Sequence, residues 1–299
     1  MIDKTIDPAR TGISKSTLMT PCARKAFYTE TVRDAQGRRL RFPMPEKVVF
    51  GTAIDYGHAR LVWARLHDEP VDLGAVIDSA VTLALTQDCS ESIEDAVFRL
   101  QVTTALRKLT GELPNRTRVV RGQFVPDEEP DGFGGTPIER IPLDGLTVQG
   151  DNGRSLRWED VVGTPDYDGP GVIDVKTSAR AYGASRFWTK PEMPVYALLH
   201  TAEHGGELPA FLAYHVYVRA AKPYWQWLSV PCPADYVALG QMHAAHWRAA
   251  MEVHEPDLFA VDLAYCGECP YREALPEYGH GGCAIGQAVV ALGSTEEAA

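Results

Sequence analysis

Long hydrophobic runs are missing from this chain of 299 residues, and positive charge is in short supply. No run of eighteen apolar residues occurs, which excludes a membrane-spanning helix of ordinary length. The first twelve residues lack the apolar stretch of a signal peptide, so we expect the protein to reside in the cytoplasm. The net charge of −11 argues against a protein that coats polyanions with its whole surface, although a local basic groove remains compatible with it.

The phosphate-binding loop G-x-x-x-x-G-K-S/T is also absent, which excludes a helicase motor of that type. Cysteine is scarce, with six residues, and in a cytoplasmic chain its C-x-x-C spacing indicates a metal chelate or a redox pair. The remaining composition, 45% apolar and 23% charged, is ordinary for a globular protein. The length allows one large domain or two modest ones.

Two charged residues interrupt an apolar strand near the middle of the chain. The strand is expected over Val172–Lys176, and its charged members, Asp174 and Lys176, point to the same face because side chains alternate along a strand. A preceding strand, expected over 161–167, contains Asp166, and a Gly-Pro-Gly turn joins the two. Buried strands tolerate charges only if they are paired or bind a metal. The segment therefore has the composition of a phosphodiesterase site, with hard oxygen ligands for Mg²⁺ or Mn²⁺ and a cation beside the phosphate.

A structural interpretation of the same residues remains open. Asp166 could cap a turn, and Asp174 and Lys176 could form a solvated ion pair on an edge strand. The D-x-K spacing alone does not distinguish this interpretation from a metal site.

The helix that follows extends the pattern to a known family. Pro165-Asp166 and Asp174-Val175-Lys176 match the two elements of the PD-(D/E)XK nuclease superfamily. Its RecB-like exonuclease branch also carries Q-x-x-x-Y on the next helix, where this chain has Glu192 and Tyr196. The chain thus resembles that branch, with the tyrosine kept and the glutamine replaced by glutamate.

The resemblance implies an α/β fold of a defined kind. We expect a restriction-endonuclease-like core, a mixed and mostly antiparallel β-sheet flanked by helices. An N-terminal helical cover would occupy residues 13–115, the nuclease core 116–232, and a final helix with a cysteine-clasped tail 233–299. Hydrophobic periodicity predicts the elements in detail: helices over 50–67, 71–87, 92–110 and 235–252, and strands over 117–125, 138–146, 156–162, 210–218 and 225–230.

A third metal ligand is expected from the helix that begins near residue 50. The family has G-T-x-x-H there, whereas this chain reads Gly51-Thr52-Ala53-Ile54-Asp55, so Asp55 takes the histidine position. His58 follows three residues later and lies on the same helix face. The resemblance implies either Asp55 or His58 as a ligand of Mg²⁺ or Mn²⁺, and both alternatives stay open.

Four cysteines suit a second metal centre. Cys22 lies in the string C-x-R-K-x-F-Y near the start, and Cys266, Cys269 and Cys283 lie near the end. RecB-like nucleases with an iron–sulfur clasp share this arrangement, so the resemblance implies a 4Fe–4S cluster that ties the two ends of the chain together. A zinc ion is the alternative, and a bare set of thiols is another. The gap before Cys283 is longer than in the family and contains His280, a rival ligand.

The resemblance implies a catalytic site formed by Asp166, Asp174, Val175, Lys176, Glu192 and Tyr196. Asp166, Asp174 and the backbone carbonyl of Val175 would hold one or two Mg²⁺ or Mn²⁺ ions. Lys176 would orient the nucleophile or neutralise the transition state, and Tyr196 would contact a backbone phosphate. The implied activity is metal-dependent hydrolysis of DNA, as an exonuclease acting on single-stranded DNA or DNA ends in recombination, repair or phage DNA processing.

Two other functions are compatible with the same sequence. One is an inactive member of the fold that binds DNA or a partner protein and keeps its metals only for structure. The other is a zinc-stapled interaction protein with an accidental D-x-K. For the nuclease, the implied partners are DNA and a helicase or recombination protein.

Overall fold

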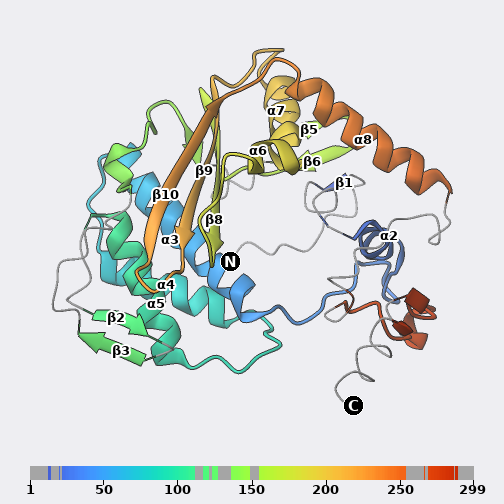
Figure 1. Ribbon diagram of the computed structural model, residues 1–299, viewed down its shortest axis with the longest axis horizontal. Helices are drawn as coiled ribbons and strands as arrows, with labels where there is room; N and C mark the ends of the chain where they lie inside the picture. Colours follow the sequence, from blue (N-terminus) through green and yellow to red (C-terminus); the bar gives the residue numbers. More distant parts are fainter. Residues whose placement is uncertain are drawn as a thin grey trace.

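The computed structural model describes residues 13–14, 20, 22–111, 117–120, 123–126, 136–148, 155–253, 266, 269–285 and 287–288 (Figure 1). A central β-sheet stands between two groups of helices, and a smaller body at one end combines the first helix with the C-terminal tail. The arm before residue 13 and the polar loop 127–135 lie outside the described residues. Within the described part of the chain, no helix is both long and apolar enough to cross a membrane.

The central sheet is mixed. In spatial order it contains β10 (Tyr224–Pro231), β9 (Phe211–Val218), β8 (Gly171–Ser178), β7 (Tyr167–Asp168) and β4 (Thr147–Val148). Strands β8 and β9 run parallel, and the other neighbouring pairs are antiparallel. Parallel neighbours need a crossover connection, and α7 (Glu192–Glu203) supplies it. The expected α/β class with a mixed, mostly antiparallel sheet is confirmed.

Three helices cover one face of this sheet: α3 (Glu46–Leu66), α4 (Leu73–Leu85) and α5 (Asp95–Leu109) (Figure 1). Alternate residues of β8, Ile173 and Val175, point into the core beneath these helices. Gly57 permits α3 and α5 to approach closely, because a Cβ there would lie 2.5 Å from a methyl carbon of Leu106. The two helices expected between residues 71 and 110 are confirmed, each slightly shorter than predicted.

The other face of the sheet is covered by α7 together with α6 (Arg186–Thr189) and α8 (Tyr236–Val253). Val172 of β8 and Val216 of β9 point into this second core. Helix α8 crosses α7 with backbone contact, since a Cβ on Gly240 would lie 2.4 Å from the carbonyl oxygen of Pro194. Residues of one strand therefore serve two cores, and Asp174 and Lys176 of β8 lie on the face that α7 covers.

The strand expected over 161–167 is broken in the structure. A separate three-stranded sheet consists of β1 (Ile13–Ser14), β6 (Val161–Gly163) and β5 (Leu156–Trp158). The break between β6 and β7 contains Asp166, whose Oδ2 accepts the backbone N–H of Val175 at 2.6 Å. A side-chain carboxylate thus replaces a backbone acceptor beside β8, and the chain passes from one sheet to the other at this point.

Two further strand predictions are wrong in detail. The strand expected over 117–125 is instead a hairpin of β2 (Thr117–Val120) and β3 (Gln123–Pro126). The sequence contains Gly122 within that range, and glycine is a residue type that favours two-residue hairpin loops. The strand expected over 138–146 is wrong: its first residues form a 3₁₀ turn, η1 (Ile138–Arg140), and strand pairing begins only after it, at β4.

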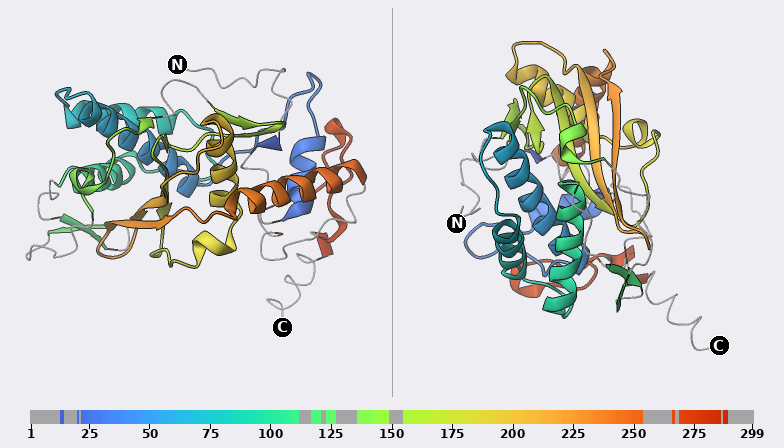
Figure 2. Two further views of the ribbon diagram at one scale, coloured as in Figure 1. Left: turned by 90° about the horizontal axis from the view of Figure 1, so that it is seen from above. Right: turned by 90° about the vertical axis from the view of Figure 1, so that its left-hand side faces the viewer.

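The two ends of the described chain meet in a third, small core. Helix α2 (Ala23–Thr31) lies beside the C-terminal tail, although the two segments are far apart in the sequence (Figure 2). The ring of Tyr28 lies 5.7 Å from that of Tyr271 and 4.4 Å from that of His280, measured between centroids. Trp247 of α8 belongs to the same core.

Candidate active site

Strand β8 presents Asp174 and Lys176 to helix α7. Asp174 is 2% exposed, and its carboxylate is in direct contact with the ammonium of Lys176. The hydroxyl of Tyr196 lies 3.1 Å from Oδ1 of Asp174 and 3.1 Å from the carbonyl oxygen of Thr164. Asp174 and Lys176, whose D-x-K spacing predicts a common strand face, therefore form an ion pair on the face of the sheet that α7 covers. They do not lie on a solvated edge strand.

Helix α7 adds a second carboxylate from the position one turn before Tyr196. Glu192 is 3% exposed, and its Oε1 lies 3.5 Å from Nζ of Lys176. Its Oε2 accepts the hydroxyl of Tyr214 at 3.1 Å. Because residues four apart share a helix face, Glu192 and Tyr196 reach the same side of β8.

Asp166 brings a third carboxylate from the break before β7. Its Oδ2 accepts the N–H of Val175, while Nζ of Lys176 lies 3.3 Å from the carbonyl oxygen of Val175. Three elements thus place Asp166, Asp174 and Glu192 around one ammonium. The sequence predicted each of these residues, and the structure brings them together.

Electrostatics keep Lys176 charged and Tyr196 protonated. Burial by itself lowers the pKa of Lys176, but attraction by Asp174, Glu192 and Asp166 together outweighs it and raises that pKa well above its ordinary value. Burial and the same three carboxylates raise the pKa of Tyr196 well above its usual range. Among these carboxylates Lys176 is therefore charged at pH 7, and the Tyr196 hydroxyl keeps its hydrogen and donates it.

Negative charge is concentrated at this site. Three carboxylates lie around the Lys176 ammonium, and two of them, Asp174 and Glu192, are buried. Buried carboxylates are costly unless cations neutralise them. Carboxylate oxygens and a backbone carbonyl are the ligand types that Mg²⁺ and Mn²⁺ prefer. Within the described residues, however, Asp166, Asp174 and Glu192 do not bring three ligand atoms within 4.8 Å of one another.

The helix residues expected to supply a further ligand lie elsewhere. His58 is on α3, which covers the opposite face of the sheet, and it hydrogen-bonds there to His215 (2.8 Å) and contacts the hydroxyl of Tyr167. The expectation that His58 binds the same metal as Asp174 is wrong, because the sheet separates them. Asp55 is exposed on α3, and the structure does not bring it into the group around Lys176.

Burial determines the protonation state of the His58 and His215 imidazoles. Burial and repulsion by His215 lower the pKa of His58 well below its ordinary value, and burial lowers the pKa of His215 to about 3. Both imidazoles are therefore neutral at pH 7 and hold the α3 face of the sheet through hydrogen bonds.

A second polar cluster on α7 was missed by the sequence analysis. His200 Nδ1 lies 2.6 Å from Oδ1 of Asp168, and His204 Nε2 lies 2.8 Å from Oδ2 of the same carboxylate. Within the described part of the chain, this is the group of three candidate metal ligands whose ligand atoms all lie within 4.8 Å of one another. The signal was present as His-x₃-His on the predicted helix, but Asp168 was assigned to a turn and not to a strand.

Of the four predicted cysteine ligands, Cys283 belongs to the small core with α2 and Cys269 packs against it. Cys22 caps α2, its Sγ accepting the N–H of Lys25 at 3.5 Å, and Cys266 and Cys283 are buried. Burial raises the pKa of the Cys269 thiol, and the proximity of Cys22 and Cys283 raises it further. Thiols from both ends of the chain are thus close enough to repel one another when ionised.

The predicted rival ligand of this centre, His280, is already engaged in packing. It is 8% exposed, its Nε2 lies 3.1 Å from the carbonyl oxygen of Tyr271, and its ring packs against Tyr28.

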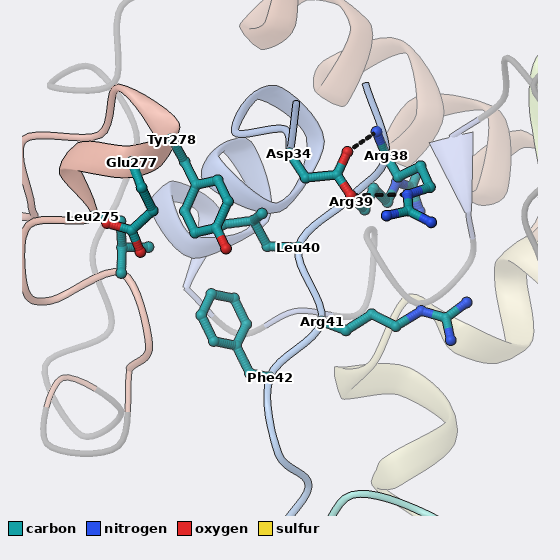
Figure 3. Close-up of a pocket in the computed structure, with 9 residues that line it drawn as sticks. All are labelled: Asp34, Arg38, Arg39, Leu40, Arg41, Phe42, Leu275, Glu277 and Tyr278. Carbon is teal, nitrogen blue, oxygen red and sulfur yellow. Dashed lines mark hydrogen bonds and ion pairs between the residues drawn. The ribbon is translucent and has the colours of Figure 1, made fainter. Parts of the chain in front are cut away.

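A pocket of about 510 Å³ opens beside this core, between residues 34–42 and the tail (Figure 3). Arginines and aromatic rings line it, but Arg38 pairs with Asp34 at 2.8 Å and Arg39 contacts Glu30. These guanidinium charges are offset by neighbouring carboxylates, so the pocket is not a strongly basic site.

No protein-family model matches this chain, and no curated protein is significantly similar to it.

Proposed function

We propose that the protein is a divalent-metal-dependent nuclease that hydrolyses phosphodiester bonds of DNA, of the RecB-like exonuclease kind. The observation that carries the proposal is the group of Asp166, Asp174 and Glu192 around Lys176. Packing alone gives no reason to gather three carboxylates at a half-covered ammonium, whereas phosphodiester hydrolysis with a metal requires such a set.

The finer fold proposal is a restriction-endonuclease-like core. It is supported by the order of the elements at the site, where β7 and β8 are antiparallel, α7 crosses over, and β9 returns parallel to β8. This order places the ends of two strands and the start of a helix around one group of polar residues.

Asp166, Asp174 and the carbonyl of Val175 would hold Mg²⁺ or Mn²⁺, with Glu192 adding negative charge nearby. The ion supplies Lewis-acid polarisation of the phosphoryl oxygen and activation of the attacking water. The Nζ of Lys176 lies beside these ligands, in contact with Asp174 and 3.5 Å from Glu192. Its ammonium would stabilise negative charge that develops on the phosphate.

Tyr196 acts as a positioning residue in this proposal. The sequence suggested a contact to a backbone phosphate, but the side chain is 1% exposed and its hydroxyl faces Asp174 and Thr164. Tyr196 therefore orients the Asp174 carboxylate and does not touch the substrate.

The segment between β8 and α7 supplies a surface for the DNA strand. Trp188 is 57% exposed on α6, and Arg180 and Lys190 are exposed in the same segment. Exposed aromatic rings stack on unpaired bases and neighbouring cations contact the backbone, which favours a single-stranded substrate or a frayed end. A helicase or recombination protein that separates strands would fit as a partner.

The cysteines supply the second proposed cofactor, a 4Fe–4S cluster with Zn²⁺ as the alternative. The proximity of Cys22, Cys269 and Cys283 supports a shared centre between α2 and the tail. Such a centre would tie the chain ends together and would not take part in hydrolysis.

Digestion of four labelled substrates tests the proposal: linear single-stranded DNA, circular single-stranded DNA, blunt duplex DNA and RNA, each with Mg²⁺ or Mn²⁺. We expect the wild type to degrade linear single-stranded DNA and the Lys176→Ala variant to be inactive on all four. The Lys108→Ala variant, which changes a buried lysine of α5 on the other face of the sheet, is the matched control. Intact substrate in every wild-type reaction, together with tight DNA binding, would favour an inactive binding module.

A further inference from the structure

The C-terminal half of α7 carries a compact group of nitrogen and oxygen ligands. Asp168 is 3% exposed, and each of its carboxylate oxygens contacts a different imidazole, that of His200 at 2.6 Å and that of His204 at 2.8 Å. The two rings stack with their centroids 4.2 Å apart. Three ligand atoms thus converge from a strand and a helix.

The backbone on both sides fixes this arrangement. Asp168 pairs with Thr147 in the β7–β4 ladder, and the turn after it is closely packed. A Cβ on Gly169 would lie 2.4 Å from the carbonyl oxygen of Gly145, so this turn accepts no side chain. The histidines are four residues apart on α7 and C-cap, the spacing at which two imidazoles on a helix share one ion.

We propose that Asp168, His200 and His204 bind a divalent transition-metal ion of the zinc type, at a site separate from the carboxylates around Lys176. Imidazole nitrogens favour Zn²⁺ and similar ions over Mg²⁺, whereas an all-oxygen set favours Mg²⁺ or Mn²⁺. Glu192 and His200 are eight residues apart, about 12 Å along a helix, so the two sites do not share ligands. This proposal does not depend on the nuclease activity.

The contacts of Asp168 with the two imidazoles are also hydrogen bonds, and the ion-bound state would use the same side-chain positions. In the hydrogen-bonded state, Nδ1 of His200 and Nε2 of His204 carry the hydrogens. Each imidazole can carry its hydrogen on the other ring nitrogen, and Nδ1 of His200 and Nε2 of His204 then offer lone pairs to an ion that takes the place of the two hydrogens. His204 is 38% exposed, which gives the ion a path from solvent and leaves room for a water ligand.

The bound ion would join the end of α7 to the β7–β4 edge of the sheet. Helix α7 also carries Glu192 and Tyr196, so its position matters to the carboxylate group at its other end. Because the three ligands come together only in the folded chain, the ion would bind the folded state and stabilise the protein.

Zinc titration in the presence of excess Mg²⁺ tests the site, because Mg²⁺ occupies oxygen-only ligands and leaves imidazoles open. The readout is the imidazole ¹H–¹⁵N spectrum, in which we expect the His200 and His204 signals alone to shift. The variants are His204→Gln, at a half-exposed position that tolerates substitution, and Asp168→Asn. The matched control is His246→Gln on α8. It removes one member of the His243–His246 pair, whose i,i+3 spacing is one residue shorter than that of His200 and His204.

We expect His204→Gln and Asp168→Asn to weaken zinc binding about 10- to 100-fold and His246→Gln to leave it unchanged. Thermal unfolding supplies a second measurement, in which Zn²⁺ raises the Tm of the wild type and of His246→Gln by more than it raises the Tm of His204→Gln. The cysteines are present in every variant, so zinc bound there raises Tm equally in all of them. Equal zinc affinity of the wild type and His204→Gln, or unshifted His200 and His204 signals, would overturn the proposal.

Discussion

The hydroxyl of Tyr196 lies 3.1 Å from Oδ1 of Asp174, inside the contact between α7 and β8. This hydrogen bond links the two elements that hold the proposed catalytic carboxylates. Because Tyr196 stays protonated and buried, its effect reaches the substrate only through Asp174.

Tyr196→Phe is expected to lower kcat about tenfold, corresponding to the ~1.5 kcal/mol of a hydrogen bond to a charged group. The KM for DNA should stay unchanged, since the hydroxyl does not contact the strand. Steady-state cleavage of a fluorescent single-stranded substrate separates the two constants. A raised KM with unchanged kcat would instead indicate a direct phosphate contact.

Glu192→Gln is expected to weaken divalent-ion binding about tenfold while preserving the maximal rate. The substitution removes one negative charge from the group around Lys176 but keeps an acceptor for the Tyr214 hydroxyl. The measurement is the Mg²⁺ concentration that gives half-maximal cleavage. If that concentration does not change, Glu192 does not contribute to metal binding.

Acid is expected to destabilise the protein through His215 and His58. Their pKa values are lowered in the folded state, so below about pH 6.5 the unfolded chain binds protons that the folded chain does not. Stability is therefore complete above pH 6.5 and falls as the pH drops toward 3, and His215 alone should cost about 2 kcal/mol by pH 5. Urea unfolding at several pH values measures the slope.

His215→Phe should reduce that slope by about one proton, and His246→Gln on the surface of α8 should leave it unchanged. Equal slopes in the wild type and His215→Phe would contradict a neutral buried imidazole at this position.

Cys269→Ser is expected to lower the bound iron or zinc and to reduce Tm by about 5 °C or more, because the tail loses its link to α2. Cys89→Ser is the matched control, a half-buried thiol that packs against the core beneath α3, α4 and α5. Anaerobic purification with a visible spectrum and a metal assay distinguishes the two cofactors. Equal metal content in both variants would remove Cys269 from the centre.

The short-range features of this fold follow from the sequence. Strand β8 was predicted because Val172 and Ile173 start an apolar run after a glycine turn, and α4 and α5 follow from their apolar period. The spacing of Asp174 and Lys176 fixed their common face. The prediction that Asp166 lies beside β8 depended on the family resemblance. The strand breaks there because the Asp166 side chain accepts a hydrogen bond from Val175, and hydrophobic periodicity does not predict such a bond.

Long-range placement was harder to predict. The face of α3 that meets the sheet is set by packing against Leu106 and Tyr167, so the sequence could not tell that His58 lies on the far side from Asp174. The cluster of Asp168 with His200 was missed for a similar reason. Its members become neighbours only through the crossover of α7 above β7 and β8.

The most direct test of the account compares the wild type with Asp174→Asn in the cleavage of end-labelled linear single-stranded DNA, with Mg²⁺ and with EDTA. Asn keeps the size of the side chain and an acceptor for the Tyr196 hydroxyl, but it removes the charge that would bind the ion. The account predicts Mg²⁺-dependent cleavage by the wild type and a loss of at least ~100-fold in Asp174→Asn, about 3 kcal/mol of transition-state stabilisation. The exposed-carboxylate control, Asp78→Asn, should cleave like the wild type. Cleavage by Asp174→Asn at the wild-type rate would contradict the account.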